Sequence, residues 1–274
     1  MTGWRRAVTI AAVAIPAMFI AAIGAAQFRR GGRFAAVPIA TAGDFDGSFM
    51  FCRIAFRQNP YGDGDGWSVD YPRADLNLSF RLSELTKTSV SRDETGEFKH
   101  VVLRLTDPLL FHCPFVMLTE PGGSFFDEME AERLREYVLK GGFLWVDDFW
   151  GPDAWRNWSE QIAKALPPGQ YPINDLPLDH SIFHTLYSVT HVPQIPSIGF
   201  WMRGGRTSER GPLSADPHVR AIVDGRGRIL VLMTFNTDFG DAFEREGDDH
   251  EYFLRFAPDG YAFGINAIVY ALSH

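Results

Sequence analysis

Acidic and amide side chains follow two apolar runs of this sequence, residues 143–146 and 229–235. In chain order these side chains are Asp147, Asp148, Asn236, Asp238 and Asp241. If both runs are neighbouring strands of a parallel sheet, their carboxyl ends bring the groups within about 10 Å of one another. Carboxylates that close need a compensating cation, arginine or shared proton. We therefore expect a raised carboxyl pKa here, with Arg53, Arg57 or a metal ion as the partner.

Other polar side chains follow further apolar runs and extend this set. Arg57 and Asn59 follow the first run, Asp107 follows the second and Glu120 follows the third. We predict that Arg57, Asn59, Asp107 and Asn236 contact a ligand. The catalytic candidates are Asp147, Asp148, His180, Asp238 and Asp241, because carboxylates and imidazoles exchange protons as general acids and bases.

Two histidines, His180 and His184, stand four residues apart. On a helix this spacing places both on one face, where they could bind a metal ion. The glutamate that follows the first histidine in zinc proteases is missing here. A histidine in a turn and another in the core are the alternatives, so the metal interpretation of this pair is the weaker one.

Several common catalytic motifs are missing from the sequence. It has no Gly-x-Ser-x-Gly nucleophile elbow, no phosphate-binding loop and no dinucleotide fingerprint. The sequence therefore names no reaction, and both an enzyme and a binding domain stay open.

Cys52 and Cys113 are the two cysteines, too few for a disulfide framework or a zinc motif. Both lie in or beside apolar runs, which favours two buried thiols. A bridge between them is the alternative in a protein outside the cytoplasm.

The first residues predict export of the protein. Residues 7–28 contain no charged residue and follow Arg5 and Arg6, which is typical of a signal peptide or a membrane anchor. We expect residues 1–28 to be this hydrophobic helix, 29–46 a linker and 47–274 a single domain. The predicted location is extracytoplasmic, either periplasmic or membrane-anchored through residues 7–28.

The charge is unevenly distributed along the chain. The net charge is −8, yet residues 1–33 hold five arginines and no acidic residue, so the remainder sets 21 basic residues against 34 acidic ones. A body this acidic repels phosphate backbones, so we expect no nucleic-acid partner.

Apolar runs and amphipathic segments alternate along the body. Strands are predicted at 49–56, 100–105, 115–119, 143–146 and 229–235, and helices at 70–86, 127–140, 152–166 and 259–272. Continuous apolar strands separated by helices favour a mainly parallel sheet with helices on both faces, an α/β fold.

Several motifs resemble a bacterial family of domains of unknown function, the one numbered 4159. They lie at residues 70–78, 107–111, 141–151, 180–183, 236–241 and 262–271. The resemblance implies a class I glutamine amidotransferase-like, flavodoxin-like fold and no particular activity. The Cys-His-Glu triad of those enzymes is not matched, because Asp147 and Asp148 stand where the nucleophile would lie.

We favour a ligand- or partner-binding module of the cell envelope, with an envelope protein or a glycan-like molecule as its ligand. Trp67, Trp150, Trp155 and Trp201 are candidates for an aromatic rim around the site. The alternative is an envelope hydrolase or transferase that uses the strand-end carboxylates, with or without a metal ion.

Overall fold

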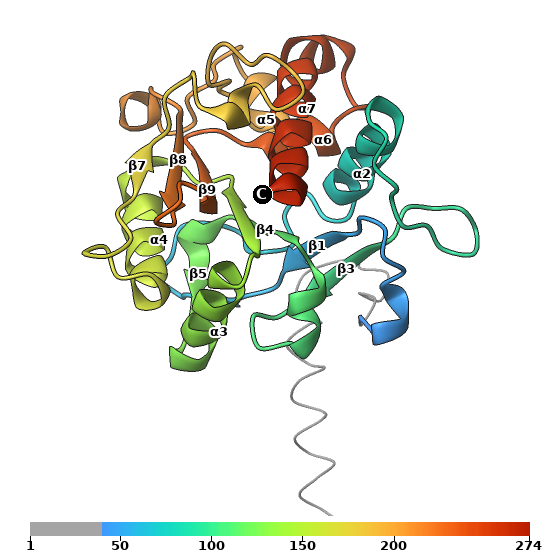
Figure 1. Cartoon of the computed structure of the whole chain (residues 1–274). Helices are drawn as coiled ribbons and strands as arrows, with labels where there is room; N and C mark the ends of the chain where they lie inside the picture. Colours follow the sequence, from blue (N-terminus) through green and yellow to red (C-terminus); the bar gives the residue numbers. More distant parts are fainter. Residues whose placement is uncertain (1–39) are drawn as a thin grey trace, which may run out of the picture. The chain divides into compact units, whose positions relative to one another are not determined.

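A mostly parallel sheet crosses the computed structural model, which describes residues 40–274. The sheet has seven strands in the order β3-β1-β4-β6-β9-β8-β7 (Figure 1). Its parallel strands are β1 (Phe51–Ile54), β3 (His100–Leu103), β4 (Phe115–Thr119), β6 (Phe143–Asp147) and β9 (Ile229–Phe235). The antiparallel strands β8 (His218–Val223) and β7 (Asn174–Asp175) complete one edge. A separate antiparallel pair is formed by β2 (Arg57–Gln58) and β5 (Ser124–Phe125).

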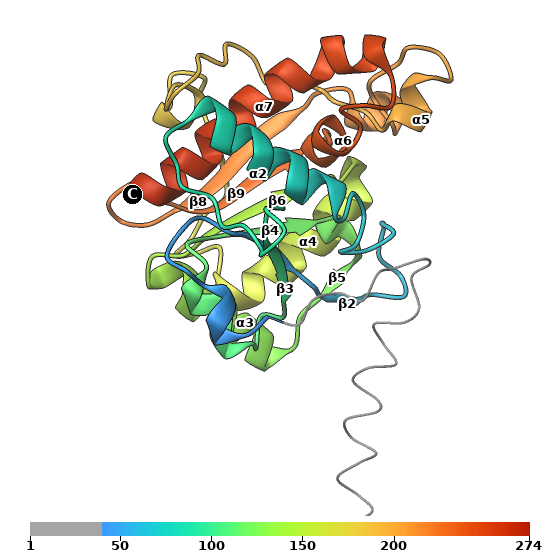
Figure 2. The ribbon, with the colours of Figure 1, turned by 90° about the vertical axis from the view of Figure 1, so that its right-hand side faces the viewer.

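Helices cover both faces of the sheet (Figure 2). The α-helices are α2 (Arg73–Leu85), α3 (Glu128–Leu139), α4 (Gly151–Ala165), α5 (Ile198–Trp201), α6 (Phe239–Glu244) and α7 (His250–Ser273). The 3-10 helices are η1 (Ala42–Asp44), η2 (Pro108–His112), η3 (Pro121–Gly123), η4 (Ser181–Phe183) and η5 (Gly211–Ser214). The prediction of an α/β fold with a mainly parallel sheet is confirmed, with an antiparallel edge that the sequence did not indicate.

The central strands are apolar on both sides because each side faces a helix layer. In β4, Phe115 and Met117 pack toward α2, α6 and α7, whereas Val116 and Leu118 pack toward α3 and α4. Fully buried aromatic rings such as Trp145 of β6 fill the first of these layers. This rigid centre fixes the positions of the loops at the carboxyl ends of the strands.

Capping explains the clearest predicted helix, α3. The Asp127 carboxylate accepts a hydrogen bond from the Glu130 N–H at 2.9 Å, and the Glu130 carboxylate accepts one from the Asp127 N–H at 2.9 Å. This reciprocal capping satisfies N–H groups that the first helical turn leaves free. The helix ends just before Gly141, whose φ of 114° suits glycine.

Two predictions about the body are wrong. Cys52 and Cys113 form a disulfide with a Cα–Cα distance of 6.3 Å, so they are not the pair of buried thiols that the apolar surroundings favoured. The last helix begins at His250 rather than at residue 259, with Pro258 inside it. The Asp249 carboxylate caps this earlier start by accepting a hydrogen bond from the Tyr252 N–H at 2.7 Å.

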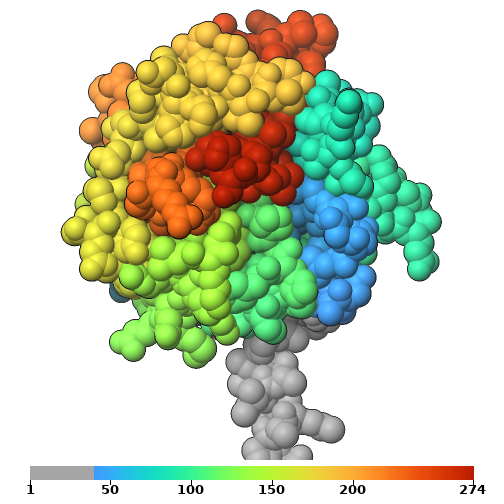
Figure 3. All heavy atoms as spheres, viewed as in Figure 1, coloured from blue at the N-terminus to red at the C-terminus, as the bar shows by residue number. Residues whose placement is uncertain are grey.

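The C-terminal end of α7 lies at the amino ends of the parallel strands. There the backbone N–H of Ile229, the first residue of β9, donates a hydrogen bond to the Tyr270 hydroxyl at 3.3 Å. Figure 3 shows this end of the helix exposed among its neighbours. The carboxyl ends of the strands, where the acidic side chains gather, are therefore at the opposite edge of the sheet.

The predicted hydrophobic segment 1–28 lies outside the described residues. Within residues 40–274, no helix has the length and apolar character needed to cross a bilayer.

Candidate functional site

Unusual backbone conformations gather at the carboxyl edge of the sheet. Glu120, Asp148 and Asn236 each come directly after a parallel strand, and each has a positive φ of 51°, 58° and 60° respectively. Asp70, just before α2, has a φ of 62°. Within residues 40–274 these four are the non-glycine residues with positive φ. Such conformations cost energy and often accompany functional sites, so this edge is the first place to look for one.

Three buried carboxylates meet at this edge. They belong to Asp70, Asp148 and Asp238, whose exposed fractions are 6%, 8% and 3%. One carboxylate oxygen from each lies within 4.8 Å of the other two. The predicted approach of the residues after β6 and β9 is thus confirmed. The sequence analysis did not single out the third member, Asp70.

The Asp70 carboxylate is the least satisfied member of this group. Its Oδ2 atom is buried and has no hydrogen-bond partner within residues 40–274. A buried acceptor without a donor costs about 1–3 kcal/mol, and more if it is charged. Gly240 leaves room for this oxygen, because a Cβ atom there would lie 2.1 Å from it.

In each of the other two carboxylates, one oxygen accepts a hydrogen bond from the protein. Asp148 Oδ1 accepts a hydrogen bond from the Trp150 indole N–H at 3.0 Å. Asp238 Oδ1 caps α6 by accepting from the Asp241 N–H at 2.8 Å. Each of these two carboxylates thus uses its Oδ1 atom in a contact within the protein, and its Oδ2 atom is the one that could reach a further ligand.

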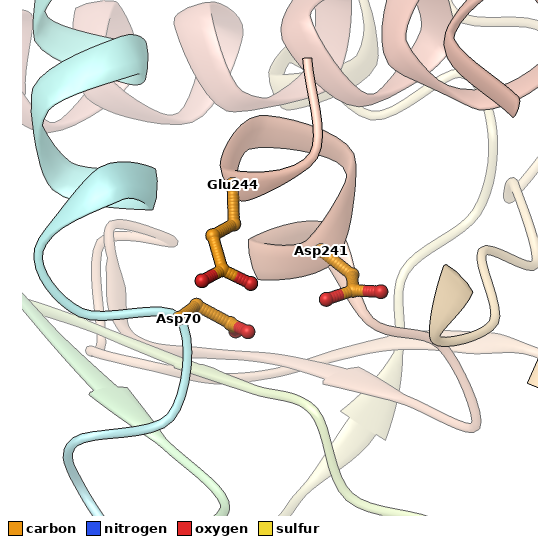
Figure 4. Close-up of side chains that lie close together, drawn as sticks. All are labelled: Asp70, Asp241 and Glu244. Atoms are coloured by element: carbon orange, nitrogen blue, oxygen red, sulfur yellow. The ribbon is translucent and has the colours of Figure 1, made fainter. Parts of the chain in front are cut away.

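A second group of carboxylates shares Asp70 (Figure 4). Oxygens of Asp70, Asp241 and Glu244 also lie within 4.8 Å of one another. Arg245 partly compensates this group, with its guanidinium 3.4 Å from Asp241 Oδ1 and 2.7 Å from Glu244 Oε2. Asp241 Oδ2 also accepts a hydrogen bond from the Ile198 N–H at 2.6 Å.

Burial and mutual repulsion hold these carboxyl groups toward their protonated forms. The pKa of Asp70 lies well above its usual range because of burial and then the charge of Asp241. Burial and then the charges of Glu120 and Asp70 raise the pKa of Asp148, and burial and then Asp148 raise that of Asp238. The expected raised pKa is therefore present in all three members of the first group.

Arg53 is the nearest buried cation, and its charge is already paired. It is fully buried and forms an ion pair with the equally buried Asp75. Its Nη1 also donates hydrogen bonds to Thr119 Oγ1 at 2.6 Å and to the carbonyls of Trp67 and Val69 at 3.2 and 3.1 Å. Arg53 therefore anchors the segment that leads to Asp70, while its attraction lowers the pKa of Asp70 only in part.

Asp147, the sequence neighbour of Asp148, accepts a hydrogen bond on each of its carboxylate oxygens. It is fully buried, and it accepts from the Thr234 hydroxyl and, at 3.0 Å, from the Gly240 N–H. Burial raises its pKa to about 7. These bonds join β6 to β9 and to α6. They indicate that Asp147 holds the elements in register while Asp148 faces the cluster.

Two predicted ligand residues take part in other contacts. Arg57 pairs with Asp127 at 2.7 Å and with Glu130 at 2.5 Å, so it is engaged there and not as the predicted partner of the cluster. The Asn59 amide donates to the Asn157 side chain at 2.8 Å. Arg57 is thus paired at the start of α3 and Asn59 with a residue of α4, and neither contact involves any of the three carboxylates.

The other two predicted ligand residues stabilise loops. Asp107 caps η2 by accepting from the Leu109 N–H at 2.9 Å. The Asn236 side chain accepts from the Gly151 N–H at 2.9 Å and donates to the Asp216 carbonyl at 2.8 Å. Asn236 is at the carboxyl edge, but its amide is occupied.

The two histidines do not share an α-helical face. His180 precedes η4 and accepts a hydrogen bond from the Ile182 N–H at 3.2 Å, and His184 follows η4 and contacts the Leu178 carbonyl at 2.8 Å. The His180 ring packs near Tyr270, at the opposite edge of the sheet from the carboxylates. A short 3-10 turn does not give the four-residue spacing that a metal pair on a helix needs.

Of the four tryptophans considered for a rim, Trp150 touches the cluster through its bond to Asp148. Trp155 stacks on Phe149, with ring centroids 6.0 Å apart, and Trp201 packs against Phe256. Trp67 packs edge-on against the Tyr71 ring. Helix and loop packing therefore accounts for three of the four.

Oxygen ligands define the chemistry that this site supports. Carboxylates are the ligands that Mg²⁺, Ca²⁺ and Mn²⁺ prefer, whereas zinc sites usually contain histidine or cysteine. Three carboxylates that are mutually repelling as anions would become compatible around one dication. The arrangement fits a divalent cation at the carboxyl edge.

The fold and the site together define a class of protein: an α/β domain with a mostly parallel sheet and acidic side chains at its carboxyl edge. Within this class, the chain belongs to the family described as "Domain of unknown function (DUF4159)", which matches residues 55–272. The predicted family is therefore confirmed. No curated protein sequence matches the chain.

Proposed function

We propose that this protein is a cation-dependent binding domain in which Asp70, Asp148 and Asp238 hold a divalent cation. The single observation that carries the proposal is the buried Asp70 Oδ2, which has no hydrogen-bond partner within residues 40–274 and stands beside two more buried carboxylates. Folded proteins seldom leave such an atom unsatisfied unless a water, an ion or a ligand completes it.

The cation would be Mg²⁺, Mn²⁺ or Ca²⁺, because the three side chains offer hard oxygen atoms alone. Three side-chain ligands leave coordination positions for water or for an oxygen of a bound ligand. Asp148 and Asp70 are the more exposed members, at 8% and 6%, so the open side of the cation would lie next to them. A glycan-like hydroxyl or an acidic group of an envelope protein would coordinate there.

We also propose an extracytoplasmic location for the domain. The Cys52–Cys113 disulfide supports it, because disulfides persist mainly in oxidising compartments. The uncharged segment 7–28 after two arginines supports it independently.

The flavodoxin-like interpretation of the fold belongs to the same proposal. Numbered in chain order, the five parallel strands are arranged 2-1-3-4-5. This order supports a flavodoxin-like sheet, in which ligands bind at the carboxyl ends of the strands. The class I glutamine amidotransferase chemistry does not follow, since both cysteines are consumed in the disulfide.

Thermal unfolding of the full-length protein after chelation tests the cation. At a free Mg²⁺, Mn²⁺ or Ca²⁺ concentration of 100 times Kd, binding to the folded state contributes about 2.7 kcal/mol. For a domain of this size that raises Tm by roughly 5–10 °C. We expect this rise in the wild type and in Asp153→Asn, which removes an exposed carboxylate on α4.

Asp70→Asn should fold and lose the rise in Tm. If none of the three cations raises Tm or binds in calorimetry, the proposed site is wrong. The hydrolase or transferase alternative stays a prediction, and turnover of a phosphate ester or glycan by the loaded protein would favour it.

A further inference from the structure

We infer that the site holds a pair of divalent cations that share the Asp70 carboxylate, the second cation lying among Asp70, Asp241 and Glu244. This inference rests on the proposed function and extends it from one cation to two. It starts from the position of Asp70, which belongs to both groups of carboxylates that lie within 4.8 Å of one another. A carboxylate has two oxygens, so one side chain can bridge two neighbouring cations.

Helical spacing brings the other two ligands of the second group together. Asp241 and Glu244 are three residues apart on α6, which puts them on the same side of the helix. Figure 4 shows both side chains beside Asp70, which comes from the segment that precedes α2. The second group is therefore built from two separate elements that the fold holds side by side.

The oxygen atoms of this group also point to a missing ligand. Glu244 Oε2 is buried and takes part in no hydrogen bond within residues 40–274, although it lies 2.7 Å from the Arg245 guanidinium. Asp70 Oδ2 has no hydrogen-bond partner in this part of the chain. Glu244 Oε2 is therefore compensated by an ion pair alone, and Asp70 Oδ2 is the oxygen in this group that a ligand must complete.

The charge balance favours two cations over one. The two groups together contain five carboxylates, those of Asp70, Asp148, Asp238, Asp241 and Glu244. Of the nearby cations, Arg53 is paired with Asp75, and Arg245 also contacts Asp248 at 3.3 Å. One dication and Arg245 would leave two of the five negative charges uncompensated, whereas two dications and Arg245 would balance all five.

The contacts of Arg245 also indicate which of the two cations binds more tightly. Its guanidinium contacts both Asp241 and Glu244, so a cation in the second group must compete with it. The first group has no such competitor within residues 40–274. The second cation should therefore bind more weakly, by roughly tenfold for a competing interaction of about 1.4 kcal/mol.

A carboxylate-bridged pair of cations selects a class of ligand. Paired cations about 3.5–4 Å apart bind an anionic oxygen group, such as a phosphate, between them. Inorganic phosphate is therefore the probe for the loaded protein, and we expect it to bind only after the second cation.

Titration of the chelator-treated full-length protein with Mn²⁺ tests the inference. Electron paramagnetic resonance measures free Mn²⁺, and native mass spectrometry counts the bound ions. We expect two Mn²⁺ per chain and a spectrum broadened by coupling between them at two equivalents. Glu244→Gln should bind one Mn²⁺ without this broadening, and Asp70→Asn should bind neither.

Two further variants separate ligation from general charge effects. Asp248→Asn removes a carboxylate that also contacts Arg245 but lies outside both groups, and it should keep two Mn²⁺. Arg245→Met removes the competing guanidinium and should tighten the second Mn²⁺ by roughly tenfold. Glu244→Asp keeps the charge but shortens the side chain, and we expect it to bind the second Mn²⁺ more weakly. This variant replaces Glu244→Gln in the test if Glu244→Gln fails to fold.

The outcomes distinguish this inference from the proposed function. If the wild type binds a single Mn²⁺ and Glu244→Gln binds it equally well, the inferred pair of cations is wrong and the proposed single-cation site is supported. Two Mn²⁺ that persist in both Glu244 variants also overturn the inferred pair. No bound Mn²⁺ in the wild type overturns the pair as inferred, and the proposed function fails with it if Mg²⁺ and Ca²⁺ do not bind either.

Discussion

Two buried aspartates near the start of α2 have opposite surroundings. Asp75, in the first turn of the helix, is fully buried and forms an ion pair with Arg53 through hydrogen bonds to both of its oxygens. Asp70, just before the helix, is 6% exposed and its Oδ2 has no partner within residues 40–274. The two carboxylates are close in sequence and differ in whether the protein supplies its own cation.

This difference separates a structural charge from a site that needs a ligand. A buried ion with a matched partner is tolerated, whereas a buried ion without one is costly. Arg53 and Asp75 hold the segment between β1 and α2 in place, and Asp70 is carried on that segment. The paired region is therefore expected to determine stability, and the unpaired region is expected to determine what the protein binds.

The largest expected effect comes from breaking the pair. Arg53→Met leaves Asp75 buried without its partner and should lower the free energy of unfolding by about 3–5 kcal/mol. Chemical denaturation of the full-length protein measures this loss. The double variant Arg53→Met/Asp75→Leu removes both charges and should recover much of it.

A small loss in the single variant would contradict the comparison, since it would mean that Asp75 does not need Arg53. A loss confined to cation binding, with unchanged unfolding, would contradict it in the same way.

The residues at the ends of the strands show best which parts of the site the sequence could predict. The apolar runs and their polar successors predicted that Asp148 and Asp238 meet, because a parallel sheet brings carboxyl ends to one edge. The same rule could not find Asp70 or Glu244, which lie on a segment before a helix and on a helix. Their contribution depends on how α2 and α6 pack together, with Gly240 admitting the Asp70 carboxylate.

Other features could not be predicted because they depend on three-dimensional proximity. Only the structure brings Cys52 and Cys113 within bonding distance, across a sequence separation of 61. The four-residue spacing of His180 and His184 would make a metal pair only on a helix, and the chain forms a short 3-10 turn there. Pro258, a common helix boundary, lies inside α7.

The next effect is a dependence of stability on pH that comes from the buried carboxyls at the carboxyl edge of the sheet. Burial raises the pKa of Asp147 from 3.8 to about 7, and raises those of Asp70, Asp148 and Asp238 as well. Between about pH 4 and 7 the folded state therefore keeps protons that the unfolded chain has released. The cation-free protein should lose stability as pH rises through this window, by up to roughly 4 kcal/mol from one such carboxyl.

Denaturation of the cation-free protein at a series of pH values measures this slope. A saturating divalent cation should reduce the slope or reverse it, because the cation favours the ionised carboxylates that the empty site disfavours. A stability that rises with pH in the cation-free protein would show that these carboxyls are ionised and compensated without a ligand.

The smallest expected effect is an increase in stability. Asp148→Asn removes one of the mutually repelling carboxylates, and its amide oxygen still accepts the hydrogen bond from the Trp150 indole. At pH 8, where ionisation is most favoured, we expect the cation-free variant to be more stable than the wild type by at least about 1 kcal/mol, the cost of one unfavourable charge pair about 4 Å apart in bulk water. Cation binding should weaken at least tenfold in the same variant. Asp153→Asn, on the exposed side of α4, should change neither quantity.

Opposite effects on stability and on binding are the mark of a residue kept for its ligand and not for the fold. A loss of stability in Asp148→Asn, with unchanged cation affinity, would instead place Asp148 with Asp75 among the structural carboxylates.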